Sequence, residues 1–175
     1  RNASGASVYE YDALGNLRSV TLPNGDVITY LVDGMGRRVG KEVNGVLVQG
    51  WLWRGRLQPV TELDGAGNVV ARYVYAGRSN VPSLMVTSGA TYRFVKDHLG
   101  SVRQVVDAAT GAVAEEIVYD SWGRVLADTN PGFQPFGFAG GLSDAASGLV
   151  RFGKRDYAAD VGRWTSADSV RFPVG

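Results

Sequence analysis

The sequence contains no cysteine, one histidine and six prolines in 175 residues, and no long apolar run. Without cysteine, the chain can form no disulfide framework, no thiolate zinc site and no thiol nucleophile. The single histidine, His98, limits imidazole chemistry to one position. No apolar segment approaches the roughly 18 residues that a membrane-spanning helix needs. We therefore predict no membrane span.

An excess of charge of one sign is also missing. The chain has 18 Lys and Arg against 17 Asp and Glu, for a formal net charge of +1. A nearly neutral chain offers neither the basic field that nucleic acid attracts nor an acidic tail, so we expect no nucleic-acid partner. A hydrophobic content of 45% excludes general disorder. Because the chain starts at Arg1 without a hydrophobic signal core, we expect a piece of a longer polypeptide.

Glycine is abundant: the 24 glycines are about twice the ordinary usage. From Gly15 to Gly123 the turn glycines recur every 9 to 12 residues, which is typical of short antiparallel strands joined by hairpins. The segments between them, such as 72–75 and 115–119, are rich in β-forming residues. A helical stripe is an alternative near 95–106, but its glycine and β-branched residues favour strands. We predict an all-β fold of consecutive antiparallel hairpins with little helix.

Five turns carry the pattern Asp-x-x-Gly. An aspartate at the first turn position can accept hydrogen bonds from nearby backbone, and glycine at the fourth adopts a positive φ. Calcium binding is the alternative, but one aspartate per turn at spacings of 21 to 33 residues favours structural turns. We likewise interpret His98 as a structural turn residue rather than a metal ligand, and expect no cofactor. The predicted turn residues are Asp12, Gly15, Asp33, Gly36, Asp64, Gly67, Asp97, Gly100, Asp120 and Gly123.

Five segments together carry a family resemblance: two copies that begin with Tyr-Asp, at residues 11–16 and 119–124, and residues 96–103, 135–140 and 147–168. This ordered set resembles the YD repeats and the associated core signature of the Rhs (rearrangement hotspot) family, whose relatives include Tc-toxin cocoons and teneurins. The resemblance implies a curved, spiralling β-sheet that forms part of a hollow shell. It divides the chain into YD/Rhs repeat hairpins at 1–130 and a core end region at 131–175 that continues the sheet.

The resemblance also implies a function. In that family the shell encloses a C-terminal effector, usually a toxin, within an exported protein. We therefore expect a structural unit for containment and delivery, secreted or at the cell surface. Its partners would be further YD repeats or other copies at the open sheet edges, and the enclosed effector.

Two alternatives remain open. The first is a self-assembling extracellular fibre or tube, because an open sheet leaves two unpaired edges. The second is a cell-surface carbohydrate or adhesion module, in which Trp51 and Trp53 on one strand face form a ligand platform. For this tryptophan pair we favour packing in the core or lumen over a ligand site.

Asp168 is the candidate catalytic residue that the resemblance implies. In related cores an aspartate at this position, followed by proline, acts with a second aspartate in autoproteolysis, and two close carboxylates suit peptide hydrolysis. Here Asp168 is followed by serine, and no second aspartate occurs before Gly175. An earlier Asp-Pro of the family is replaced by Ala158-Ala159. We therefore predict no complete catalytic site in this chain and no enzymatic activity.

Overall fold

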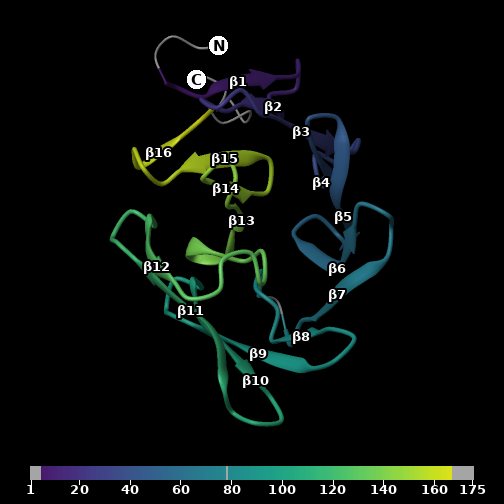
Figure 1. Ribbon diagram of the computed structural model, residues 1–175, viewed down its shortest axis with the longest axis vertical. Helices are drawn as coiled ribbons and strands as arrows, with labels where there is room; N and C mark the ends of the chain where they lie inside the picture. The colour runs from purple at the N-terminus through teal and green to yellow at the C-terminus, as the bar shows by residue number, and fades with distance from the viewer. Residues whose placement is uncertain (1–4, 78, 167–175) are drawn as a thin grey trace, which may run out of the picture.

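The computed structural model describes residues 5–77 and 79–166, and it confirms the predicted all-β fold. Twelve strands form one sheet, in which each strand pairs antiparallel with the next one along the chain (Figure 1). We call this sheet the wall. Its strands are Val8–Tyr11 (β1), Leu17–Thr21 (β2), Val27–Val32 (β3), Arg38–Val43 (β4), Val46–Arg54 (β5), Gln58–Asp64 (β6), Val69–Val74 (β7), Leu84–Val86 (β8), Thr91–Lys96 (β9), Val102–Asp107 (β10), Val113–Tyr119 (β11) and Val125–Asp128 (β12).

A second sheet of four strands follows, and Figure 1 shows it inside the curl of the wall. We call it the end sheet. The one helix among the described residues is a short 3₁₀ turn that precedes it, and no helix in this part of the chain has the length and apolar character to cross a membrane. These elements are Phe138–Gly140 (η1), Leu142–Asp144 (β13), Leu149–Phe152 (β14), Arg155–Ala158 (β15) and Arg163–Trp164 (β16).

Five turns of the wall share one set of contacts. In the first turn, Asp12 Oδ1 accepts the backbone N–H groups of Leu14 and Asn16, both at 2.9 Å. The N–H of Gly15 donates to the Asp12 carbonyl at 3.0 Å, and Gly15 has a φ of +78° that favours glycine. The same contacts recur in the turns that begin at Asp33, Asp64, Asp97 and Asp120. Each turn is therefore closed by its own local sequence.

Register shifts accompany the curvature of the wall. Eight of its eleven strand pairs contain one; the exceptions are β2–β3, β7–β8 and β8–β9. A bulge bends its strand and increases the local right-handed twist, so repeated bulges curl a long sheet. The wall curls without closing into a barrel, and β1 and β12 are its two edges (Figure 1).

The end region does not continue the wall as predicted, because strand pairing stops after β12 and resumes as a separate sheet at β13. Pro131 and Pro135 lie between the two sheets and have no backbone N–H to donate to a ladder. The chain turns inward there, and Phe136 packs edge-on against Tyr73 and Phe94 of the wall, with ring centroids 5.0 and 5.6 Å apart. The domain boundary near residue 130 stays a prediction.

Candidate functional site

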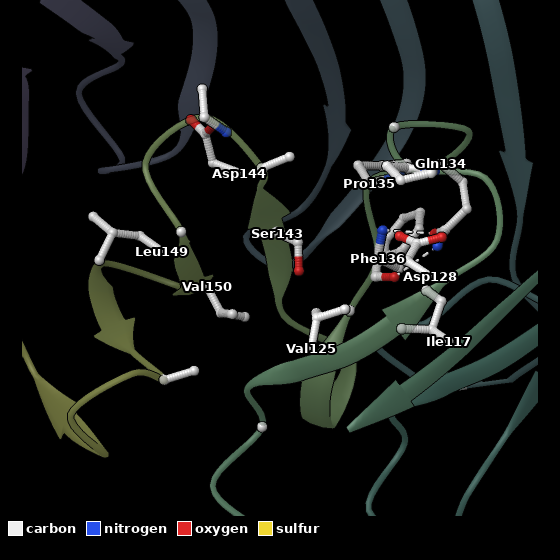
Figure 2. Close-up of a pocket in the computed structure, with 18 of the residues that line it drawn as sticks. Ile117, Val125, Asp128, Gln134, Pro135, Phe136, Ser143, Asp144, Leu149 and Val150 are labelled. Carbon is white, nitrogen blue, oxygen red and sulfur yellow. Dashed lines mark hydrogen bonds between the residues drawn. The ribbon is translucent and has the colours of Figure 1, made fainter. Parts of the chain in front are cut away.

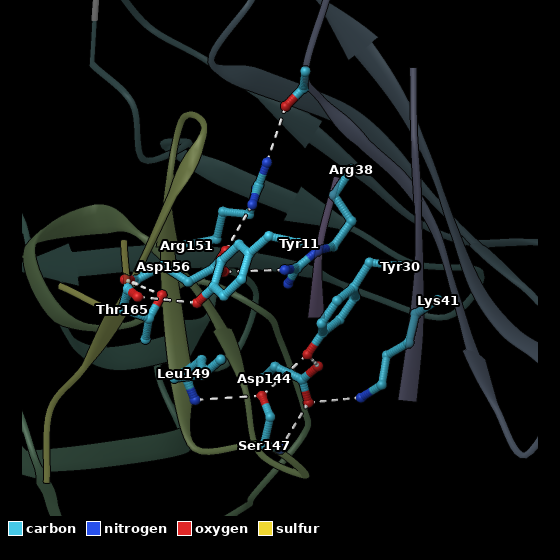
Figure 3. Close-up of polar contacts among 11 residues, drawn as sticks. Tyr11, Tyr30, Arg38, Lys41, Asp144, Ser147, Leu149, Arg151, Asp156 and Thr165 are labelled. Atoms are coloured by element: carbon cyan, nitrogen blue, oxygen red, sulfur yellow. Dashed lines mark hydrogen bonds and ion pairs between the residues drawn. The ribbon is translucent and has the colours of Figure 1, made fainter. Parts of the chain in front are cut away.

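The end sheet meets the first wall strands through a buried polar contact (Figure 3). We call this contact the seam, and an apolar cluster lies beside it that joins Leu149 of the end sheet to Leu17, Val20 and Ile28 of the wall. The seam binds strands that are more than a hundred residues apart in the sequence. Its residues are Tyr30, Arg38, Lys41, Asp144, Arg151 and Asp156.

Asp144, at the end of β13, accepts two hydrogen bonds from the wall. The Tyr30 hydroxyl donates to Oδ2 and the Lys41 ammonium donates to Oδ1, each at 2.6 Å. Burial alone would raise the pKa of Asp144, but the charge and hydrogen bond of Lys41 and the Tyr30 hydrogen bond together hold it below its ordinary value. Burial and the nearby Asp144 carboxylate raise the pKa of Tyr30. Asp144 is therefore an anion in the folded protein, and Tyr30 is neutral.

Asp156, on β15, lies between two buried guanidinium groups. Arg38 Nη2 donates to Oδ1 at 3.0 Å, and Arg151 Nη1 donates to Oδ2 at 2.7 Å. Arg151 also donates to the carbonyl of Gly36 at 3.0 Å, and the Arg38 guanidinium carbon lies 3.3 Å from the ring centroid of Tyr30. Burial lowers the pKa of Arg151, and the Arg38 charge adds to this effect. One carboxylate thus holds two cations that come from different sheets.

A partly open cavity of about 570 Å³ lies between the wall and the end sheet. Figure 2 shows Val125, Ser143 and Val150 around this space. Ile117 and Phe136 add apolar surface to its lining. Both the wall and the end sheet contribute to the cavity, so it forms only when the two are in contact.

Glu115 is the most deeply buried carboxylate that lines this cavity, with 1% of its surface exposed. Gln134 Nε2 donates to its Oε2 at 2.8 Å and to the carbonyl of Phe136 at 2.9 Å. Burial raises the pKa of Glu115 to about 7; the Gln134 hydrogen bond opposes the shift, and the nearby charge of Asp128 adds to it. Glu115 therefore changes its charge near neutral pH.

Four further carboxylates line the cavity: Glu62, Asp128, Asp144 and Asp160. Glu62 accepts hydrogen bonds from Gln49 Nε2 and from the Tyr73 hydroxyl, each at 2.6 Å. Asp128 pairs with Ile117 across β11 and β12, which places it on the same face as Glu115. Asp144 is paired with Lys41, but within residues 5–77 and 79–166 no ion pair involves Glu115, Glu62 or Asp128. The cavity is therefore anionic at the wall.

The predicted tryptophan platform is largely inside the molecule. Trp51 is 5% exposed and stacks on Tyr73, with ring centroids 6.4 Å apart. Trp53 is half-buried, packs against the same aromatic cluster, and its Nε1 donates to the Arg38 carbonyl at 2.8 Å. The pair therefore stabilises the inner face of the wall rather than offering a flat aromatic surface to solvent.

The other predicted residues do not assemble into a catalytic or metal site. His98 is exposed in its turn, and Asp168 lies outside the described residues. The five turn aspartates lie in five separate turns, each bonded to its own backbone. Among the described residues, no group of three or more His, Asp or Glu side chains is arranged to hold a metal ion.

Sequence reasoning missed Glu115 and the seam. Alternation along 113–119 places Glu115 on the same face as Ile117, and that signal was sufficient to predict an inward-facing carboxylate. Arg151 and Asp156 belong to the motif that carries the family resemblance, but nothing in their spacing indicates Arg38 as a partner.

An open sheet of sequential hairpins that curls around its own end segment defines a repeat-built β-shell. A family model described as Teneurin YD-shell matches residues 2–173, and the chain belongs to this family. Mouse teneurin-4 is 31% identical over 169 residues, which are 94% of this chain and 6% of that protein. The tRNA nuclease WapA of Bacillus subtilis (strain 168) is 28% identical over 173 residues, which are 96% of this chain and 7% of that protein.

Solved structures show the same fold at lower identity. The crystal structure of TcdB2-TccC3 matches 94% of this chain and 9% of its own, with a TM-score of 0.69 and 20% identity. The Photorhabdus luminescens Tc holotoxin pore matches 98% of this chain and 9% of its own, with a TM-score of 0.67 and 19% identity. The chain thus spans less than a tenth of the length of these relatives. It is a structural YD-shell unit.

Proposed function

We propose that this unit forms part of a shell that encloses an effector polypeptide in an exported protein and keeps it apart from its surroundings until delivery. The observation that carries the proposal is the wall, a twelve-stranded sheet that curls around an interior and holds an end sheet inside it (Figure 1). Hairpins added in sequence would extend such a wall without limit, since each pairs only with its neighbours.

The matches to relatives support a structural role for this chain as part of a shell, without catalytic activity of its own. The match to a protein named as a tRNA nuclease covers 7% of its length, and the same region matches teneurins, whose names carry no nuclease activity. This pattern is the one expected when an effector activity resides in another part of the polypeptide. We accordingly propose no enzymatic activity for this chain, and we propose export from the resemblance to the Tc holotoxin pore.

Limited proteolysis of the full polypeptide that contains this chain tests enclosure. We expect the effector segment to resist protease in the wild type and to be cleaved when Asp156→Ala opens the seam. The matched control is Glu116→Gln, because Glu116 is exposed on the outer face of the wall. Cleavage of the effector in the wild type, as fast as in an isolated effector, would contradict enclosure.

Assembly into a fibre is the second candidate. It is favoured by exposed apolar side chains on the two edge strands, with Val8 43%, Val125 50% and Leu126 55% exposed. Unpaired edges of this kind are templates for another strand. Intact mass under denaturing and native conditions distinguishes the two. A single-chain mass near 18.7 kDa with native polymers would support the fibre, and a much larger continuous chain would support the shell.

A further inference from the structure

Glu115 has a carboxylate oxygen without a partner. Gln134 donates to Oε2, and within the part of the chain that the structure describes, no hydrogen bond reaches Oε1. The side chain is almost completely buried and lines the cavity. A buried carboxylate without a counter-charge is costly, so the folded protein gains stability when a cation approaches it.

Among the described residues, the two cations that line this cavity, Lys41 and Arg124, are each paired with an aspartate. Lys41 Nζ lies 2.6 Å from Asp144, and Arg124 pairs with Asp120 in their shared turn at 3.3 Å. Glu115, Glu62 and Asp128 therefore leave uncompensated negative charge on one side of the cavity. A positively charged ligand would find both a direct acceptor and a favourable field there.

The apolar side chains that line the rest of the cavity favour a ligand with an apolar part. The apolar side chains of Ile117, Val125 and Val150 surround the same space, as Figure 2 shows. A volume of about 570 Å³ lies within the range that small-molecule sites occupy. A ligand with a charged end and an apolar stem would satisfy both parts of the lining.

The acceptor geometry favours ammonium over guanidinium. A guanidinium group binds best to both oxygens of a carboxylate at once, but Gln134 already occupies Oε2 of Glu115. One open oxygen suits the compact ammonium group. We propose that the cavity binds a primary alkylammonium group, with Glu115 Oε1 as its acceptor and the apolar lining around its stem.

This chemistry has two sources, a lysine side chain of an enclosed polypeptide or a free alkylamine. If the ligand is a lysine side chain of an enclosed polypeptide, the inference rests on the proposed enclosing function; if it is a free alkylamine, it does not. Binding depends on the cavity alone, so its failure would leave protease protection of an effector untouched.

The first test is titration of the purified protein with 1-aminohexane by calorimetry at pH 8, with 1-hexanol as the uncharged control. We expect the amine to bind at least 10-fold more tightly than the alcohol, and Glu115→Gln to weaken amine binding at least 10-fold. Glu116→Gln, one residue along the same strand on the outer face, should bind like the wild type. Circular dichroism confirms that each variant is folded. Equal binding of amine and alcohol, or unchanged binding by folded Glu115→Gln, would overturn the proposal.

The second test is the pH profile of the same titration. Because burial raises the pKa of Glu115 to about 7, amine binding should be about 30-fold weaker at pH 5.5 than at pH 8. The charged and titratable groups that line the cavity with Glu115 are Lys41 on β4, Glu62 on β6, Tyr119 on β11, Arg124 before β12, Asp128 on β12, Asp144 on β13 and Asp160 after β15, and the Arg103 guanidinium carbon on β10 lies 5.6 Å from the Tyr119 ring centroid. A profile that Glu115→Gln does not flatten would overturn the assignment to Glu115.

The third test separates the sources. The peptide acetyl-Leu-Lys-Leu-amide is compared with the same peptide carrying norleucine in place of lysine. Lysine-dependent peptide binding would support an enclosed polypeptide as the source. Binding of 1-aminohexane without peptide binding would support a free amine, and binding of neither would overturn the proposal.

Discussion

The wall and the end sheet are both antiparallel, but different interactions hold them in place. Wall strands pair with their sequence neighbours, and eight of eleven pairs contain a register shift. The end sheet has three pairs without a shift, and its seam joins residues that are 103 to 118 positions apart. Local turn chemistry therefore determines the wall, whereas long-range side-chain contacts position the end sheet.

Removing the seam carboxylate should have the largest effect on this comparison. Asp156→Ala leaves the buried guanidinium groups of Arg38 and Arg151 without their anion, so we expect the free energy of unfolding to fall by about 3–5 kcal/mol. Urea unfolding measures the change. The matched wall substitution, Asp64→Ala, removes a partly exposed turn aspartate that has no ion pair among the described residues, and it should cost much less. Equal losses from the two substitutions would contradict the difference between the regions.

The pH dependence of the free energy of unfolding tests Glu115, which lies where the wall faces the end region. Burial raises the pKa of Glu115 to about 7, so the folded protein binds this proton more tightly than the unfolded chain. The stabilising contribution of Glu115 is complete below pH 4.5 and declines as the pH rises through 7, by at most about 3 kcal/mol. Urea unfolding at pH 4.5 and pH 8 should show wild type losing this stability relative to Glu115→Gln. A constant difference between the two proteins would disprove the assignment.

Two glycines, one in the wall and one before the end sheet, allow the same comparison with smaller expected changes in stability. Gly67, in a wall turn, has a φ of +85° with open space around it, so alanine there should cost about 1–2 kcal/mol through its backbone and asparagine less. Gly141, before β13, has a φ of −74°, but a Cβ there would lie 2.5 Å from Val150 and 2.8 Å from the Phe152 ring. Alanine at Gly141 should cost about 1–3 kcal/mol through crowding, and asparagine more.

Unfolding of all four glycine variants measures both rankings. The order of alanine and asparagine should reverse between the two positions. The same order at both positions would mean that one mechanism governs both glycines.

The sequence was sufficient to predict the wall because its information is local. Asp64 and Gly67, for example, close a turn with atoms no more than four residues apart. The position of Phe136 between Tyr73 and Phe94 of the wall depends instead on where the curled sheet brings distant strands. The Arg38–Asp156 contact is of the same kind, since neither residue carries a local signal for the other. Asp168, the catalytic candidate, stays untested because it lies outside the described residues.

The strict neighbour pairing of the wall has a consequence for folding kinetics. Each hairpin closes a short loop, so strands can add one after another as the chain becomes available, with little entropy lost per step. The Arg38–Asp156 contact, across 118 positions, must wait until nearly the whole wall exists. The seam should therefore form after the rate-limiting step, and weakening it should speed unfolding while leaving the folding rate nearly unchanged.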